Sequence, residues 1–163
     1  MSETRRPRGR KHTPVEWVAE MLCAEASYEK VYHRPLHDEP MPSIPVLAEL
    51  MQRLRAVIFP GYFGHSDITP ENMRFHIGAN LDAIYRLLTD QVRRGYCFFC
   101  ELNGAGNCQE CEDRAQKLAG EFLMRLPDIR ERLAEDAQAA YEGDPASRSP
   151  GETIFCYPSL TAL

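Results

Sequence analysis

Apolar side chains recur at intervals of three and four residues along most of this chain, the spacing that places them on one face of an α-helix. The clearest segment begins at Thr69-Pro70-Glu71, which supplies a capping hydroxyl, a proline at the first helical position and an acid in the first turn. Its apolar positions continue to Arg93-Arg94-Gly95 and are Met73, Ile77, Leu81, Ile84, Leu88 and Val92. This pattern predicts a long amphipathic helix.

Four other segments carry the same pattern, at residues 14 to about 33, 43–60, 109–126 and 127–141. Thr13 and Pro14 begin the first of them with a capping hydroxyl and a proline. Turn residues and aromatic rings mix over residues 59–65, and we expect these rings to pack inward. No stretch shows the sustained apolar-polar alternation of a strand. The sequence therefore predicts an all-α fold, a helical bundle of about five to six helices with a Cys-rich loop and no sheet.

The chain is expected to have three parts. Residues 1–13 are predicted to be a disordered basic tail, and residues 14–142 a helical domain. Residues 143–163 are predicted to be a hinge and the start of a connecting helix. Within the helical domain, residues 35–45 hold four prolines, which favours a linker or an extended wrap over the interior of a helix.

The formal net charge of −5 combines a basic start with an acidic body. Five basic residues lie in the first eleven positions and leave about −10 on the rest: Arg5, Arg6, Arg8, Arg10 and Lys11. An acidic body argues against a nucleic-acid-binding face, which needs clustered basic side chains. No apolar run approaches the length of a membrane span, and no apolar leader follows the basic start. We expect a cytoplasmic protein with no nucleic-acid or membrane partner.

Two C-x-x-C pairs, Cys97 with Cys100 and Cys108 with Cys111, are separated by a short Gly-rich stretch. Four thiolates can close a tetrahedron around zinc, so the spacing predicts a structural zinc site with these four ligands. Four protein ligands leave no open position for water or substrate, which argues against a catalytic metal. The alternatives are an iron-sulfur cluster, or thiols that pack as small apolar side chains or are reversibly oxidised.

Two further cysteines and two histidines could also carry chemistry. Cys23 and Cys156 stand apart from the pairs and from any convincing histidine partner in the sequence, so we expect packed apolar roles for them. His65 and His76 lie near the aromatic loop and the long helix, where either could join a metal or substrate site. A hydrogen-bonded structural role is the commoner one for such histidines.

After the segment 127–141, an aspartate lies between a glycine that can end the helix and a proline that restricts its backbone. The predicted buried stripe of this helix consists of Ile129, Leu133, Ala137 and Ala140, and Arg130 is predicted to face away from it. Gly143 is predicted to end the helix with a positive φ, and Pro145 excludes Asp144 from the helical region. The carboxylate of Asp144 is thus held from both sides. It can meet a ligand ammonium or hydroxyl, or it can simply cap the following turn.

Several short motifs together resemble the end of the helical amino-terminal domain of serine O-acetyltransferases. These motifs are Leu126-Pro127-Asp128-Ile129-Arg130, Asp136-Ala137-Gln138-Ala139, Gly143-Asp144-Pro145-Ala146 and Ile154-Phe155-Cys156-Tyr157-Pro158. Three further features resemble a bacterial branch of that family: Phe59-Pro60-Gly61-Tyr62-Phe63, the helix around His76-Ile77-Gly78 and Leu81-Asp82, and the paired C-x-x-C motifs. The similarity covers roughly residues 43–163.

The resemblance implies an enzyme that transfers an acetyl group from acetyl-CoA to the hydroxyl of L-serine, in cysteine biosynthesis. It implies that Asp144 helps to bind serine and that the feedback inhibitor cysteine competes for the same site. In the family, a His-Asp pair in a left-handed parallel β-helix deprotonates the serine. The helical domain also joins subunits into larger assemblies in many members, which implies a homo-oligomer.

The sequence departs from the family because the hexapeptide repeats of the β-helix and its catalytic histidine are absent from these 163 residues. We therefore expect part of an acetyltransferase that holds a serine-binding Asp144, no catalytic residue and no activity of its own. Two alternatives remain open: a stand-alone zinc-stabilised helical module whose basic tail recruits an acidic partner, and a thiol sensor that uses the paired cysteines.

Overall fold

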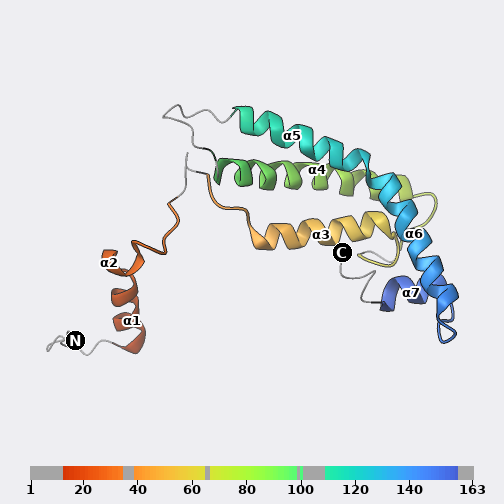
Figure 1. The fold of residues 1–163 in the computed structure, drawn as a ribbon, viewed down its shortest axis with the longest axis horizontal. Coiled ribbons are helices and arrows are strands. Elements are labelled where there is room, and N and C mark those ends of the chain that lie inside the picture. The colour runs from red at the N-terminus through yellow and green to blue at the C-terminus, as the bar shows by residue number, and fades with distance from the viewer. Residues whose placement is uncertain (1–12, 35–38, 65–66, 99, 101–108, 158–163) are drawn as a thin grey trace. The chain divides into compact units, whose positions relative to one another are not determined.

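The computed structural model describes residues 13–34, 39–64, 67–98, 100 and 109–157. Over these residues the protein is all-α with no sheet, as the sequence predicts, and Pro60 and Phe63 form only an isolated bridge. The chain divides into two compact units, Met1–Arg34 and Pro35–Leu163. The first holds α1 (Pro14–Leu22) and α2 (Glu25–Tyr28) (Figure 1). The second holds α3 (Ile44–Ile58), α4 (Met73–Phe98), α5 (Gln109–Met124), α6 (Leu126–Gly143) and α7 (Pro150–Cys156). The described residues thus form seven helices, one of them a single turn, where five to six were expected.

In the first unit, α1 begins as predicted but ends early. Thr13 caps it, and Glu16 completes a reciprocal capping box, its carboxylate accepting the N–H of Thr13 at 2.7 Å. The helix predicted to reach residue 33 is instead interrupted, because Ala24 takes an extended conformation before α2. Neither helix has a buried residue. The apolar face that the pattern assigned to a core is therefore exposed within this unit.

The core of the second unit lies where α4 packs against α3 and α5. Ile84 on α4 is fully buried and forms a cluster with Leu50 and Val57 of α3. On α5, Ala115 and Ala119 are also fully buried. Such small side chains allow two helix backbones to approach closely. Figure 1 shows α4 between α3 and α5.

The limits of α4 differ from the prediction at both ends. The segment from Thr69 forms a turn before the helix, because the side chain of Asn72 accepts the N–H of Thr69 at 2.8 Å and donates to the carbonyl of Asp67 at 3.0 Å. The helix therefore starts at Met73. It then continues through Gly95 to Phe98, and Cys97 in its last turn is buried.

A hydrogen bond and an ion pair join residues of the proline-rich segment to α4. The amide oxygen of Gln91, which is buried, accepts the backbone N–H of Ser43 at 2.6 Å. Arg93 pairs with Glu39 of the same segment and with Glu112 of α5, the latter at 3.3 Å. The contact with Glu39 is the main cause that raises the pKa of Arg93. In the described part of the segment, Glu39 and Ser43 thus contact α4, whereas Ile44 and Pro45 already belong to the first turn of α3.

The aromatic loop after α3 turns inward. Phe59 is buried, and Phe63 packs against it with ring centroids 6.2 Å apart. Gly61 and Gly64 have φ of 87° and 82°, in the left-handed region where glycine is favoured. The prediction of inward rings is confirmed for both phenylalanines, whereas Tyr62 stays partly exposed.

Candidate functional site

Asp144, the predicted substrate-binding residue, occupies the position that ends α6. Gly143 is the last residue of α6 and does not have a positive φ, so the predicted left-handed cap at Gly143 is wrong. Asp144 is the C-cap, with φ −116° and ψ 104°. This is the extended backbone that a following proline favours. Pro145 therefore ends the helix by excluding Asp144 from helical geometry, and no left-handed residue is needed.

Both carboxylate oxygens of Asp144 accept a hydrogen bond from the chain. Oδ1 accepts the backbone N–H of Ala146 at 2.8 Å, which closes the turn after α6. Oδ2 accepts the hydroxyl of Tyr157, thirteen residues further along the chain. The turn-capping role that the sequence left open is thus present in the structure. A ligand role for Asp144 stays a prediction at this point.

These bonds favour the charged form of the carboxylate. The hydroxyl of Tyr157 is the larger cause that lowers the pKa of Asp144, and the N–H of Ala146 adds to it. The same contact raises the pKa of Tyr157. An ionised carboxylate has about four lone-pair positions, of which two are used here. Asp144, which is partly exposed, can therefore still accept hydrogen bonds from an ammonium or hydroxyl group of a ligand.

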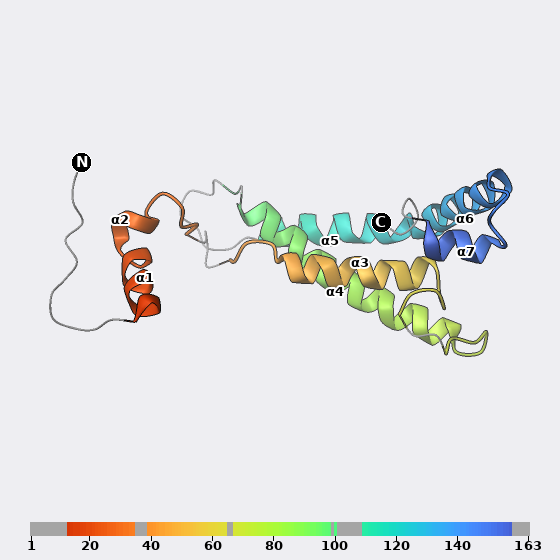
Figure 2. The same cartoon turned by 90° about the horizontal axis from the view of Figure 1, so that it is seen from below.

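Tyr157 is brought to Asp144 by α7, a helix that the sequence reasoning missed. The local signal was present, since Ser149 precedes a proline and its Oγ accepts the N–H of Glu152 at 3.2 Å. Thr153 is fully buried, and its hydroxyl lies 3.1 Å from that of Ser147. Figures 1 and 2 both show α7 beside α6. The partnership between Tyr157 and Asp144 depends on this packing, and sequence spacing alone does not indicate it.

Three of the four predicted zinc ligands are described, and Cys108 lies outside the described residues. Cys97 in the last turn of α4 and Cys111 in the first turn of α5 are buried. The Sγ atoms of Cys100 and Cys111 are 3.9 Å apart. Two thiolates bound to one tetrahedral zinc, each at about 2.3 Å, are about 3.8 Å apart. This sulfur pair therefore fits two ligands of a single zinc ion.

The described cysteines do not by themselves complete a metal site. In the part of the chain that the structure describes, no three His, Cys, Asp or Glu side chains are grouped so that they could hold a metal ion. The prediction of a four-cysteine zinc site therefore stays a prediction, in which Cys108 is required.

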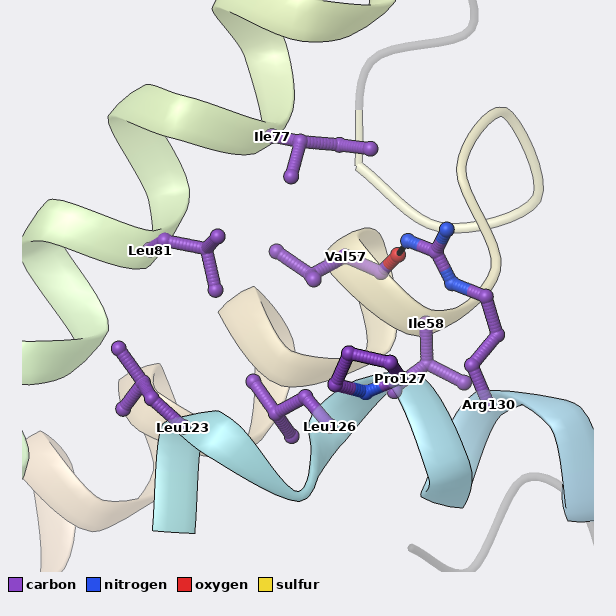
Figure 3. A pocket seen from close by; sticks show the side chains of 8 residues that line it. All are labelled: Val57, Ile58, Ile77, Leu81, Leu123, Leu126, Pro127 and Arg130. Carbon is purple, nitrogen blue, oxygen red and sulfur yellow. Dashed lines mark hydrogen bonds between the residues drawn. The ribbon is translucent and has the colours of Figure 1, made fainter. Parts of the chain in front are cut away.

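An apolar pocket of about 190 Å³ is lined by side chains of α3, α4, α5 and α6. Arg130 lies at its rim and donates a hydrogen bond to the carbonyl oxygen of Val57 (Figure 3). That carbonyl belongs to the last turn of α3, where carbonyls lack a donor within the helix. The prediction that Arg130 faces away from the buried side of its helix is therefore wrong. The other side chains that line the pocket are Val57, Ile58, Ile77, Leu81, Leu123, Leu126 and Pro127.

The remaining candidates do not assemble around Asp144 in the described structure. His76 is partly buried on α4, with its Nε2 3.5 Å from the side-chain nitrogen of Asn80. His65 lies outside the described residues. Cys23 and Cys156 are exposed, so the packed roles expected for them are not observed. No helix in the described ranges combines the length and apolar character of a membrane span.

Comparison with known proteins relates the chain to an acetyltransferase. The chain is 35% identical over 144 residues to a protein of Synechococcus elongatus named serine acetyltransferase, plasmid. The matched region covers 86% of this chain and 45% of the relative, so the chain spans about half the length of the curated relative that it matches. No family model matches the chain. The resemblance drawn from the sequence motifs is confirmed, and the helical chain is homologous to part of a serine acetyltransferase.

Proposed function

We propose that this chain is the helical part of a serine O-acetyltransferase, a cytoplasmic enzyme that transfers an acetyl group from acetyl-CoA to L-serine. The 35% identity to a serine acetyltransferase over most of the chain is the observation that carries the proposal. The reaction forms an ester bond between the serine hydroxyl oxygen and the acetyl carbon, and it releases the CoA thiol. No catalytic base is assigned to any of these 163 residues.

Asp144 has the proposed role of binding L-serine, and cysteine would compete for the same carboxylate as an inhibitor. The carboxylate is ionised and partly exposed, and it keeps lone pairs beyond those used by Ala146 and Tyr157. A charge-assisted hydrogen bond to the ammonium or hydroxyl of serine suits such a group. Asp144 would thereby fix the orientation of the amino acid, while the chemistry of acyl transfer is carried out elsewhere.

The test is steady-state kinetics of Asp144→Ala in the full-length protein. A hydrogen bond to a charged group contributes about 1.5–3 kcal/mol, which predicts a rise of roughly 10- to 100-fold in the Michaelis constant for serine. Affinity for acetyl-CoA should persist, which calorimetry can measure. Glu142→Ala, an exposed carboxylate two residues earlier, is the matched control. Unchanged serine kinetics in Asp144→Ala would remove this residue from the site.

We also propose that the helical part joins subunits into a homo-oligomer. The support is the apolar face of α1, which is unburied within its own unit: Val15 is 78% exposed and Leu22 is 62% exposed. The chain has one tryptophan, Trp17, and it lies on this helix. Burial of Trp17 on assembly should shift its fluorescence to the blue as light scattering reports a larger mass. A chain that stays monomeric at all concentrations would contradict the proposal.

We propose, last, a structural zinc site between α4 and α5. Its four ligands would be Cys97, Cys100, Cys108 and Cys111. The support is the sulfur separation of Cys100 and Cys111, together with the pairing of the two motifs in the sequence. Zinc would cross-link the end of α4 to the start of α5. Elemental analysis should give about one zinc per chain.

The matched variants are Cys111→Ser, which removes a proposed ligand, and Cys156→Ser, which removes an exposed thiol outside the cluster. The first should lose both zinc and thermal stability, and the second should keep both. Metal-free protein whose Tm does not change in Cys111→Ser would rule the site out.

A further inference from the structure

Tyr157 is part of the motifs that resemble the acetyltransferases, yet those motifs assign it no role. We propose that Tyr157 is a positioning residue, whose hydroxyl holds the carboxylate of Asp144 in the orientation that receives L-serine. This inference rests on the proposed function, in which Asp144 binds serine. It adds a residue that acts through Asp144 and need not touch the substrate.

The two hydrogen bonds to Asp144 approach different oxygens of the carboxylate. The N–H of Ala146 binds Oδ1 at 2.8 Å, and the hydroxyl of Tyr157 binds Oδ2. The torsion that rotates an aspartate carboxylate has a broad minimum, so one hydrogen bond leaves the plane of the group weakly defined. A second donor on the other oxygen fixes that plane. The lone pairs that remain then point in defined directions toward a ligand.

The position of Tyr157 is itself fixed by α7. Tyr157 is the C-cap of this helix, and its N–H donates to the carbonyl of Thr153 at 3.1 Å. Thr153 is fully buried, and Ile154 packs against the cluster that contains Leu126 and Phe59. Because α7 is anchored through the buried Thr153 and the partly buried Ile154, the phenol hydroxyl is presented to Asp144 from a packed helix. A carboxylate placed in this way loses little entropy when it binds a ligand.

A purely structural role for the Tyr157 hydroxyl predicts a different outcome from a positioning role. The bond joins two groups near the surface, where loss of one hydrogen bond changes stability only modestly. Loss of orientation would instead appear in the affinity for serine. The two roles are therefore separated by comparing kinetics with thermal stability.

The first experiment tests the contact itself and does not depend on any enzyme activity. In the 163-residue chain, the pKa of Asp144 is followed by carbon-13 NMR of its carboxylate. Tyr157→Phe removes the donor, so the pKa of Asp144 should rise toward its ordinary value. Tyr141→Phe, which alters a tyrosine near the end of α6, is the matched control and should leave the pKa of Asp144 unchanged. An unchanged pKa in Tyr157→Phe would overturn the inference at its first step.

The second experiment measures the kinetics of full-length Tyr157→Phe, Asp144→Ala and the double variant. Tyr157→Phe should raise the Michaelis constant for serine roughly 5- to 10-fold, with kcat and the Michaelis constant for acetyl-CoA unchanged, because the binding of serine is weakened equally in the ground state and in the transition state. The double variant should be no worse than Asp144→Ala alone, since Tyr157 acts through Asp144. The Tm of Tyr157→Phe should fall only slightly, as expected for the loss of one hydrogen bond near the surface.

The outcomes separate the inference from the proposed function. If Asp144→Ala leaves serine kinetics unchanged, the proposed role of Asp144 in serine binding fails. If Asp144→Ala raises the Michaelis constant but Tyr157→Phe does not, the role of Asp144 stands and the inference about Tyr157 is overturned. Additive effects in the double variant would also overturn it, because they would show that Tyr157 acts independently of Asp144.

Discussion

The hydrogen bond from Arg130 to Val57 joins α6 to the end of α3, and the substitution Arg130→Met tests its contribution. Methionine keeps much of the apolar stem of arginine and removes the guanidinium. The carbonyl of Val57 then loses its donor beside an apolar pocket. A hydrogen bond from a charged group contributes about 1.5–3 kcal/mol, and a cation at a helix C-terminus adds about 0.3–1 kcal/mol. Arg130 is partly exposed, which reduces both contributions, and we expect a loss of about 2 kcal/mol in the free energy of unfolding.

Urea denaturation followed by circular dichroism measures this loss, and Arg132→Met supplies the control. Arg132 lies on the same helix but is exposed, so its substitution should change the free energy of unfolding by about 0.5 kcal/mol or less. Arg130→Lys should recover part of the loss, because an ammonium can donate to one carbonyl but lacks the planar fork of arginine. Equal effects of Arg130→Met and Arg132→Met would refute the argument that Arg130 caps α3.

Two further predictions concern the core and the Asp144 turn. Ile84→Ala should lower the free energy of unfolding by about 3–4 kcal/mol, because Ile84 is fully buried. Leu118→Ala, on the exposed side of α5, should lower it by about 1 kcal/mol or less. Similar urea midpoints for the two variants would contradict this prediction. The bond between Asp144 and Tyr157 should stabilise α7 at neutral pH and be lost as pH falls through the lowered pKa of Asp144, or rises through the raised pKa of Tyr157. The difference in Tm between the unmodified chain and Tyr157→Phe should therefore shrink at both extremes, and a difference independent of pH would argue against the bond.

The sequence by itself determined the helical character of the chain and most of its helix starts. Capping needs only neighbouring residues, so Thr13 and Pro14 could be recognised as a helix start without a structure. Four of the six predicted apolar positions of the long helix pack in the core: Ile77, Leu81, Ile84 and Leu88. Asp144 could be singled out because Pro145 restricts it locally, whatever lies around it.

Tertiary structure decided the features that depend on residues far apart in the chain. The packing of α7 on α6 places Tyr157 against Asp144. The packing of α6 on the end of α3 lets Arg130 donate a hydrogen bond to the carbonyl of Val57. The long helix runs through Gly95 because the helix penalty of one glycine, about 1 kcal/mol, is small enough to be offset by tertiary packing such as the burial of Cys97 in the turn that follows. Periodicity and capping are local properties, whereas the partner of a side chain is chosen by the packing of whole helices. Sequence reasoning could therefore find the carboxylate, and only the fold showed what holds it.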